Sequence, residues 1–198
     1  GNLEAMRMFS RTILAMAKGE LEQDMTAYDY SQTTREYFQR IASKTASLFA
    51  AAAEGGAIVS GALDAWRAAL RDYGENVGMA FQIVDDVPDV SGDDTRLGKR
   101  PGTDIKEGTV TILSLHALDN GINIDRSELI RILRKRNRTW GEVHTALRMI
   151  RDTNAVETAK TDARAFGDIA CRSLESLPDT EARQHMRDLV DFVLSRQS

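Results

Sequence analysis

The sequence predicts an all-α protein. Only 3 of the 198 residues are proline, and no stretch shows the alternation of apolar and polar residues that marks a half-buried strand. Helix-start signals, a Thr or Asp followed three residues later by Glu, occur at Thr33, Asp125 and Thr139. Apolar residues at intervals of three or four follow these signals, which indicates helices that each bury one face.

The amino-terminal half predicts three long helices, at residues 3–28, 34–54 and 62–89. The second of them begins after Thr33, and its apolar stripe is formed by Ile41, Leu48 and Phe49. The segment from Ser91 to Glu107 has no helical pattern and is rich in Gly, Asp and Lys. Loops of this length in a compact helical protein are more often functional than idle, so this segment is a candidate for a binding loop.

The carboxy-terminal half predicts shorter helices, at residues 108–119, 126–136, 140–151, 154–176 and 180–196. Three of them have clear apolar stripes, formed by Val143, Ala146, Leu147 and Ile150; by Ala159, Ala163, Phe166 and Ala170; and by Ala182, Met186, Leu189, Val190 and Val193. The small residues of the middle stripe permit close contact between helices. Because no linker or repeat interrupts the pattern, residues 1–198 are expected to form a single helical domain.

The composition excludes several classes of protein. Apolar residues make up 42% and charged residues 28%, as in ordinary globular domains, and the net charge of -4 argues against a nucleic-acid-binding surface. Cys171 is the only cysteine, so no internal disulfide is possible and a cytoplasmic location fits best. The histidines lack metal-ligand spacing, which disfavours zinc. No apolar run approaches the roughly 18 residues of a membrane span, and no secretory signal is evident.

Three carboxylates interrupt an otherwise apolar helix near the end of the third predicted helix. Asp85 and Asp89 are one helical turn apart, and Gln82 precedes Asp86 by one turn, so these four side chains are expected to converge. Clustered carboxylates need a cation, and hard oxygen ligands suit Mg²⁺, which usually also holds substrate phosphates. The alternative is an acidic helix end leading into a solvated loop.

Pro88 lies inside this cluster. Proline removes one helical hydrogen bond and its ring clashes with the preceding turn. We therefore expect the helix to end or kink at Pro88, with Asp89 turned outward.

Lys44 and Thr45 form a second candidate site. Lys44 follows Ile41 by three residues and precedes Leu48 by four, so it lies beside the apolar stripe rather than opposite it. Its stem could cover the core while the amine reaches water. The functional alternative is an ammonium group held against a phosphate oxygen, with the Thr45 hydroxyl as a second donor.

The segment from Gly98 to Asp104 combines glycines, which allow close approach to a ligand, with the cations Lys99 and Arg100. It is not a P-loop, because the spacing from Gly92 is one residue too long and Arg100 stands where Ser or Thr is required. An ordinary charged loop is the alternative. The basic run from residue 131 to 138 falls at a predicted helix end and is assigned to solvent.

These elements occur in a recognisable order. The motifs are Gly19-Glu20-x-x-Gln23, Lys44-Thr45-Ala46-x-Leu48-Phe49, Gly74-x-x-x-Gly78-x-x-x-Gln82-x-x-Asp85-Asp86-x-x-Asp89 and Gly98-Lys99-x-x-Gly102-x-Asp104-x-x-Glu107-Gly108. Together they resemble the trans-isoprenyl (polyprenyl) diphosphate synthase family over essentially the whole chain. The resemblance implies an antiparallel helical bundle of the isoprenoid synthase type around a deep cavity, incomplete at the amino terminus, in a protein that is usually a homodimer.

The resemblance also implies a reaction. In this family an allylic diphosphate bound through Mg²⁺ loses its diphosphate to give an allylic cation. The double bond of isopentenyl diphosphate attacks that cation, and a proton is then lost. The expected product here is a medium- or long-chain polyprenyl diphosphate. No nucleic acid and no membrane span are implied.

Carried over position by position, the resemblance assigns the metal site to Asp85, Asp86 and Asp89. It assigns contacts with the allylic diphosphate to Lys44, Thr45, Gln82 and Lys99. Lys44, Asp85 and Lys99 are the residues expected to be catalytic, and Asp85 is the expected direct Mg²⁺ ligand.

The chain departs from the family pattern in ways that matter. The family's first aspartate-rich motif would lie upstream of Gly1, and Pro88, Thr109 and Leu113 replace an aliphatic residue, a lysine and a proline that are common at these positions. We expect the chain to be the carboxy-terminal part of a synthase and to be inactive by itself. One alternative is a non-catalytic partner subunit of a heteromeric synthase. Another is a helical scaffold with a decayed site, against which the joint retention of the charged motif residues speaks.

Overall fold

The computed structural model describes residues 2–92, 100–120 and 124–196, and within these ranges it contains helices and no strand. The all-α prediction is therefore confirmed. The helices are α1 (Leu3–Met25), α2 (Thr34–Ile41), a π-helical turn (Ala42–Ala46), α3 (Ser47–Ser60), α4 (Asp64–Ser91), α5 (Thr103–Glu107), α6 (Ile112–Asn120), α7 (Arg126–Arg134), α8 (Trp140–Arg151), α9 (Ala155–Ser173), a 3₁₀ turn (Leu174–Ser176) and α10 (Glu181–Ser195).

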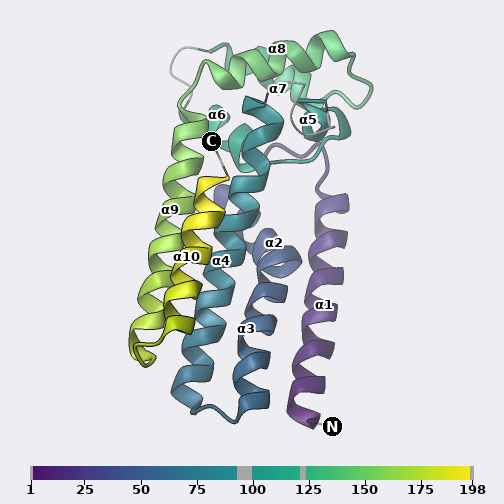
Figure 1. Ribbon diagram of the computed structural model, residues 1–198. Coiled ribbons are helices and arrows are strands. Elements are labelled where there is room, and N and C mark those ends of the chain that lie inside the picture. The colour runs from purple at the N-terminus through teal and green to yellow at the C-terminus, as the bar shows by residue number, and fades with distance from the viewer. Residues whose placement is uncertain (1, 93–99, 121–123, 197–198) are drawn as a thin grey trace.

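The long helices α1, α3, α4, α9 and α10 run side by side, while α5, α6, α7 and α8 gather at one end of this bundle (Figure 1). Helix α4 is central because it packs against both α3 and α9. Its carboxy-terminal end, which carries the aspartate cluster, therefore lies at the end of the bundle where the short helices gather. No helix in the described ranges is both long enough and apolar enough to cross a membrane.

Local sequence signals place the helix starts. The Thr33 and Thr139 side chains each accept a hydrogen bond from a backbone N–H three residues on, and the glutamates at those positions accept in return, so both predicted capping boxes form. Asp125 likewise accepts from the backbone N–H of Glu128. The apolar faces that follow are buried in one cluster, to which α4 contributes Val77, Ala80, Ile83, Val84 and Val90.

Glycines bring α4 into close contact with α3. A Cβ atom at Gly74 would lie 2.5 Å from the backbone oxygen of Phe49, and one at Gly78 would lie 2.5 Å from the Cα of Ala46. Such contacts are shorter than any stable packing distance, so only glycine permits this separation of the two helices. The close approach places the π-helical turn directly against α4.

Four local expectations differ from the structure. The predicted helix 34–54 is divided by the π-helical turn and continues to Ser60. Of the two outcomes expected at Pro88, an end or a kink, the end is wrong: α4 continues to Ser91, since proline removes only one donor near a helix end, and the Pro88 carbonyl still accepts from the Gly92 N–H at 2.8 Å. The segment expected to be irregular contains the short helix α5, and the helix predicted from residue 108 begins at Ile112.

The close packing of α3 and α4 makes a prediction about stability. Replacing Gly74 with Ala forces a methyl group into backbone atoms of α3, and we expect a loss of about 1–3 kcal/mol in the free energy of unfolding. Gly56→Ala is the matched control, because a Cβ there meets nothing within 4 Å, and it should stabilise the helix by roughly 0.5–1 kcal/mol. Urea denaturation measures both changes. A Gly74→Ala protein as stable as the wild type would contradict this account of the packing.

Candidate functional site

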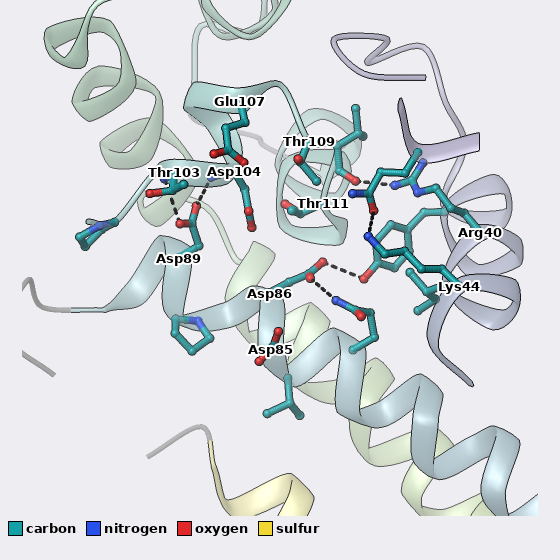
Figure 2. A pocket seen from close by; sticks show the side chains of 18 of the residues that line it. Arg40, Lys44, Asp85, Asp86, Asp89, Thr103, Asp104, Glu107, Thr109 and Thr111 are labelled. Atoms are coloured by element: carbon teal, nitrogen blue, oxygen red, sulfur yellow. Dashed lines mark hydrogen bonds between the residues drawn. The ribbon is translucent and has the colours of Figure 1, made fainter. Parts of the chain in front are cut away.

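A polar hollow lies at the end of α4. It is a cavity of about 660 Å³ between α2 with its π-helical turn, the last turns of α4, and α5 with the segment that follows it. Polar and charged residues dominate its lining, and Figure 2 shows many of them pointing into it. The polar and charged lining residues are Gln23, Tyr37, Arg40, Lys44, Gln82, Asp85, Asp86, Asp89, Thr103, Asp104, Glu107, Thr109, Thr111 and Arg196.

Asp86 is the buried centre of the site. Its Oδ2 accepts a hydrogen bond from the Tyr37 hydroxyl at 2.8 Å, and its Oδ1 accepts from Gln82 Nε2 at 3.0 Å. The backbone N–H of Ile112, the first residue of α6, also donates to this carboxylate. The Gln82 Oε1 in turn accepts from the Thr45 hydroxyl at 2.8 Å. One hydrogen-bonded chain thus joins the π-helical turn, α4, α2 and the start of α6.

Burial disfavours the ionised form of the Asp86 carboxyl. The residue is 7% exposed, and burial raises the pKa of its carboxyl to about 6, even though the hydrogen bonds from Tyr37, Gln82 and Ile112 favour the ionised form. The neighbouring Asp85 raises the pKa further.

The three aspartates point in different directions (Figure 2). Asp85 is exposed and makes no hydrogen bond or ion pair with any described residue. The Asp89 carboxylate accepts from the backbone N–H groups of Thr103 at 3.0 Å and Asp104 at 3.3 Å, at the start of α5. Consequently, no three Asp, Glu, His or Cys side chains of the described residues gather closely enough to hold a metal ion by themselves.

Lys44 lies on the opposite wall, in the π-helical turn. Such turns are rare and occur mostly at functional sites. The Lys44 ammonium forms an ion pair with Glu20 at 2.7 Å and donates to Gln23 Oε1 at 3.1 Å, both on α1. Gly19 makes this arrangement possible, because a Cβ there would lie 2.6 Å from the backbone nitrogen of Lys44. The motif Gly19-Glu20-x-x-Gln23 therefore positions the lysine.

The structure brings most of the predicted site residues to one cavity. Lys44, Gln82, Asp85, Asp86 and Asp89 all line it, and Thr45 is hydrogen-bonded to Gln82 behind the wall. Lys99 lies outside the described residues. Their assignment to metal or substrate remains a prediction.

Sequence reasoning missed several residues of the wall. Tyr37 and Arg40 precede Lys44 by seven and four residues, and the helical period could have placed them on the same face. Arg196 could not have been found in this way. It reaches the cavity from the carboxy-terminal end of α10 and lies 5.2 Å from the centre of the Phe81 ring.

The sequence pattern of the polyprenyl synthetase family matches residues 1–150. The chain belongs to this family. Among individual relatives, it is 34% identical over 196 residues to heptaprenyl diphosphate synthase component 2 of Geobacillus stearothermophilus, and 32% identical over 196 residues to octaprenyl diphosphate synthase of Escherichia coli. These alignments cover 99% of this chain but 60% of each relative, so the chain spans about three fifths of their length.

Solved structures of family members have the same fold. A polyprenyl synthase from Caulobacter crescentus, complexed with calcium and isoprenyl diphosphate, superposes with a TM-score of 0.92 at 33% identity, over 99% of this chain and 60% of that one. A decaprenyl diphosphate synthase from Rhodobacter capsulatus gives a TM-score of 0.90 at 32% identity, over 100% of this chain and 61% of that one. The helical arrangement in Figure 1 is therefore that of prenyl synthases.

Titration of Asp86 makes a prediction about stability in metal-free buffer. Its carboxyl has a pKa of about 6 in the folded protein against a usual value of 3.8. Between these values the folded state holds a proton that the unfolded state has lost, so stability falls as the pH rises. Two pKa units correspond to about 3 kcal/mol.

Urea denaturation in EDTA at about pH 4.5 and about pH 7 measures this loss. The Asp86→Asn protein lacks the titrating group, although its amide faces donors and should lower stability at both pH values. The wild type should therefore lose more stability with rising pH than the variant. Equal pH dependence in the two proteins would show that Asp86 does not titrate in this range.

Proposed function

We propose that the complete protein is a polyprenyl diphosphate synthase that adds isopentenyl diphosphate to an allylic diphosphate. The observation that carries the proposal is the cavity at the end of α4, which is lined both by the Asp85 carboxylate, free of other described residues, and by Lys44. Membership of the family, and the heptaprenyl and octaprenyl diphosphate synthases among its relatives, supply the substrate class. The cavity offers both a cation-binding group and a phosphate-binding group, which a diphosphate substrate requires.

The site residues fit Mg²⁺. This ion keeps several waters and is usually held by one or two carboxylates together with substrate phosphates, rather than by a cage of protein ligands. Asp85 offers such a carboxylate, because both of its oxygens are free of other described residues. Calcium in the Caulobacter crescentus synthase supports use of a divalent ion in the family. When bound, Mg²⁺ would neutralise charge on the diphosphate.

The residues of this chain then act on the leaving group and its surroundings. Lys44 binds the diphosphate oxygens and stabilises the negative charge that develops as the carbon–oxygen bond breaks. The hydrogen bond from Thr45 to Gln82 fixes the amide that in turn holds Asp86, so the wall does not rearrange as charge moves. The double bond of isopentenyl diphosphate attacks the allylic carbon, and loss of a proton completes the addition.

Three further assignments concern the product, the assembly and the location of the protein. We propose a medium- or long-chain product, because the similar proteins include heptaprenyl, octaprenyl and decaprenyl synthases. We propose a homodimer, which the exposed apolar side chains of α1 support, namely Leu3, Met6, Phe9, Ile13, Leu14, Leu21 and Met25. The single cysteine supports a reducing, cytoplasmic location.

A second candidate is a subunit of a heteromeric synthase. The relative from Geobacillus stearothermophilus is named component 2, which implies at least one further component. The reading frame upstream of Gly1 distinguishes the two candidates. An in-frame DDxxD motif favours a synthase that is complete in one chain, whereas a start codon near Gly1 favours a partner subunit.

Asp85 provides the test of the metal site. In the complete enzyme, Asp85→Ala should lower kcat by about 100-fold or more, since the diphosphate loses a cation at the bond that breaks. Because Asp85 is exposed, the free energy of unfolding should change by less than about 0.5 kcal/mol. Asp72→Ala, an exposed aspartate on the same helix outside the cavity, is the matched control. Unchanged turnover in Asp85→Ala would show that this carboxylate does not hold the metal.

The 198-residue chain by itself is expected to have little or no prenyltransferase activity, because no three Asp, Glu, His or Cys side chains in its described part gather closely enough to hold a metal ion, and the chain spans about three fifths of its relatives' length. Incubation with Mg²⁺, an allylic diphosphate and radiolabelled isopentenyl diphosphate, followed by extraction of the products, measures it. Robust product formation would mean that no second carboxylate cluster is needed.

A further inference from the structure

Helix α2 places a buried arginine on the wall of the cavity. Arg40 is 5% exposed and lies one turn after Tyr37, the residue that donates to Asp86. A buried guanidinium is costly unless its donors are used, so its hydrogen bonds show what the group holds together.

The Arg40 guanidinium joins two segments that lie far apart in the sequence. Its Nη2 donates to the backbone oxygen of Val110 at 2.5 Å. Its Nη1 donates to Gln32 Oε1 and, at 3.4 Å, to the Thr26 hydroxyl. The planar guanidinium group of Arg40 thus links the connection between α1 and α2 to the segment between α5 and α6. Figure 2 shows Arg40 beside the cavity residues Thr109 and Thr111.

A second contact holds the same segment from the same side. The backbone N–H of Tyr28 donates to the Gly108 oxygen at 2.8 Å, so the carbonyls of Gly108 and Val110 are both held by this region. Tyr28 has a φ of 65°, which is uncommon for a residue other than glycine and persists only where the surroundings enforce it. Gln32 Nε2 donates to the backbone oxygens of Thr26 at 3.0 Å and Asp29 at 2.7 Å. These hydrogen bonds fix the Gln32 side chain that accepts from Arg40.

The held segment forms one wall of the site. Thr109 and Thr111 line the cavity on either side of Val110, and the next residue, Ile112, donates its N–H to Asp86. A shift of this segment would therefore move two hydroxyl groups and remove a donor from the buried carboxylate.

We propose that Arg40 is a positioning residue that holds the Thr109–Thr111 segment against the cavity, and so sets the geometry in which the diphosphate is bound. This inference rests on the proposed function for the identity of the ligand. Arg40 directs its terminal nitrogens to protein acceptors, so it acts on the diphosphate through the threonine wall. Lysine would keep the charge but could not bridge both segments.

Hydrogen exchange of the complete protein tests the structural half of the proposal. In both Arg40→Met and Arg40→Lys, the amides of residues 109–112 should exchange at least about tenfold faster, because local opening of the wall costs less free energy. Arg35→Met is the matched control, since Arg35 is exposed on the same helix and makes no recorded hydrogen bond. Unchanged exchange in Arg40→Met would overturn the proposal.

Calorimetric binding of inorganic pyrophosphate with Mg²⁺ tests the functional half. The Kd should rise about tenfold in both Arg40 variants, which corresponds to loss of about one well-placed hydrogen bond to a charged group. Gly74→Ala, destabilised at a distance from the cavity, should keep the wild-type Kd and so separates stability from positioning. A wild-type Kd in Arg40→Lys would overturn positioning and show that charge alone matters. Failure of the wild type to bind pyrophosphate would instead overturn the proposed function, while the exchange result would stand.

Discussion

The buried carboxylate of Asp86 is the interaction on which the site depends. Donors from α2, α4 and the start of α6 converge on its two oxygens. In a low-dielectric interior, each donor is worth more than in water, and removing one leaves a charge that is costly to bury. These demands fix three elements relative to one another. They also occupy Asp86 with protein partners, whereas Asp85, one residue earlier, is exposed and makes no contact of this kind with any described residue.

Packing decides how close the two walls of the cavity come. Gly78 allows the π-helical turn to lie against α4, and Gly19 allows α1 to approach Lys44 from the other side. The lysine thereby meets Glu20 and Gln23 instead of solvent alone. Gly78 and Gly19 thus help to shape the site, although neither carries a reactive side chain.

Much of the fold follows from local pattern. The capping boxes at Thr33 and Thr139 form as predicted because their partners lie three residues away, within the range of the sequence signal. One of the wrong expectations, the irregular segment after α4, has its cause in a tertiary contact. Helix α5 begins where the Asp89 carboxylate, more than a dozen residues earlier in the chain, accepts its first backbone N–H groups. No pattern within residues 91–107 reports that partner.

The sequence by itself determined the helical class, most helix starts and the residue types of the site, since periodicity, caps and clustered charges act over a few neighbouring positions. Only the tertiary structure decided which carboxylate is buried, which is open, and that Arg40 holds a segment 70 residues away. Those outcomes depend on the direction of each side chain and on the partner that packing brings to it. Local sequence contains neither, because a helix that presents Asp85, Asp86 and Asp89 on adjoining faces fits several surroundings equally well.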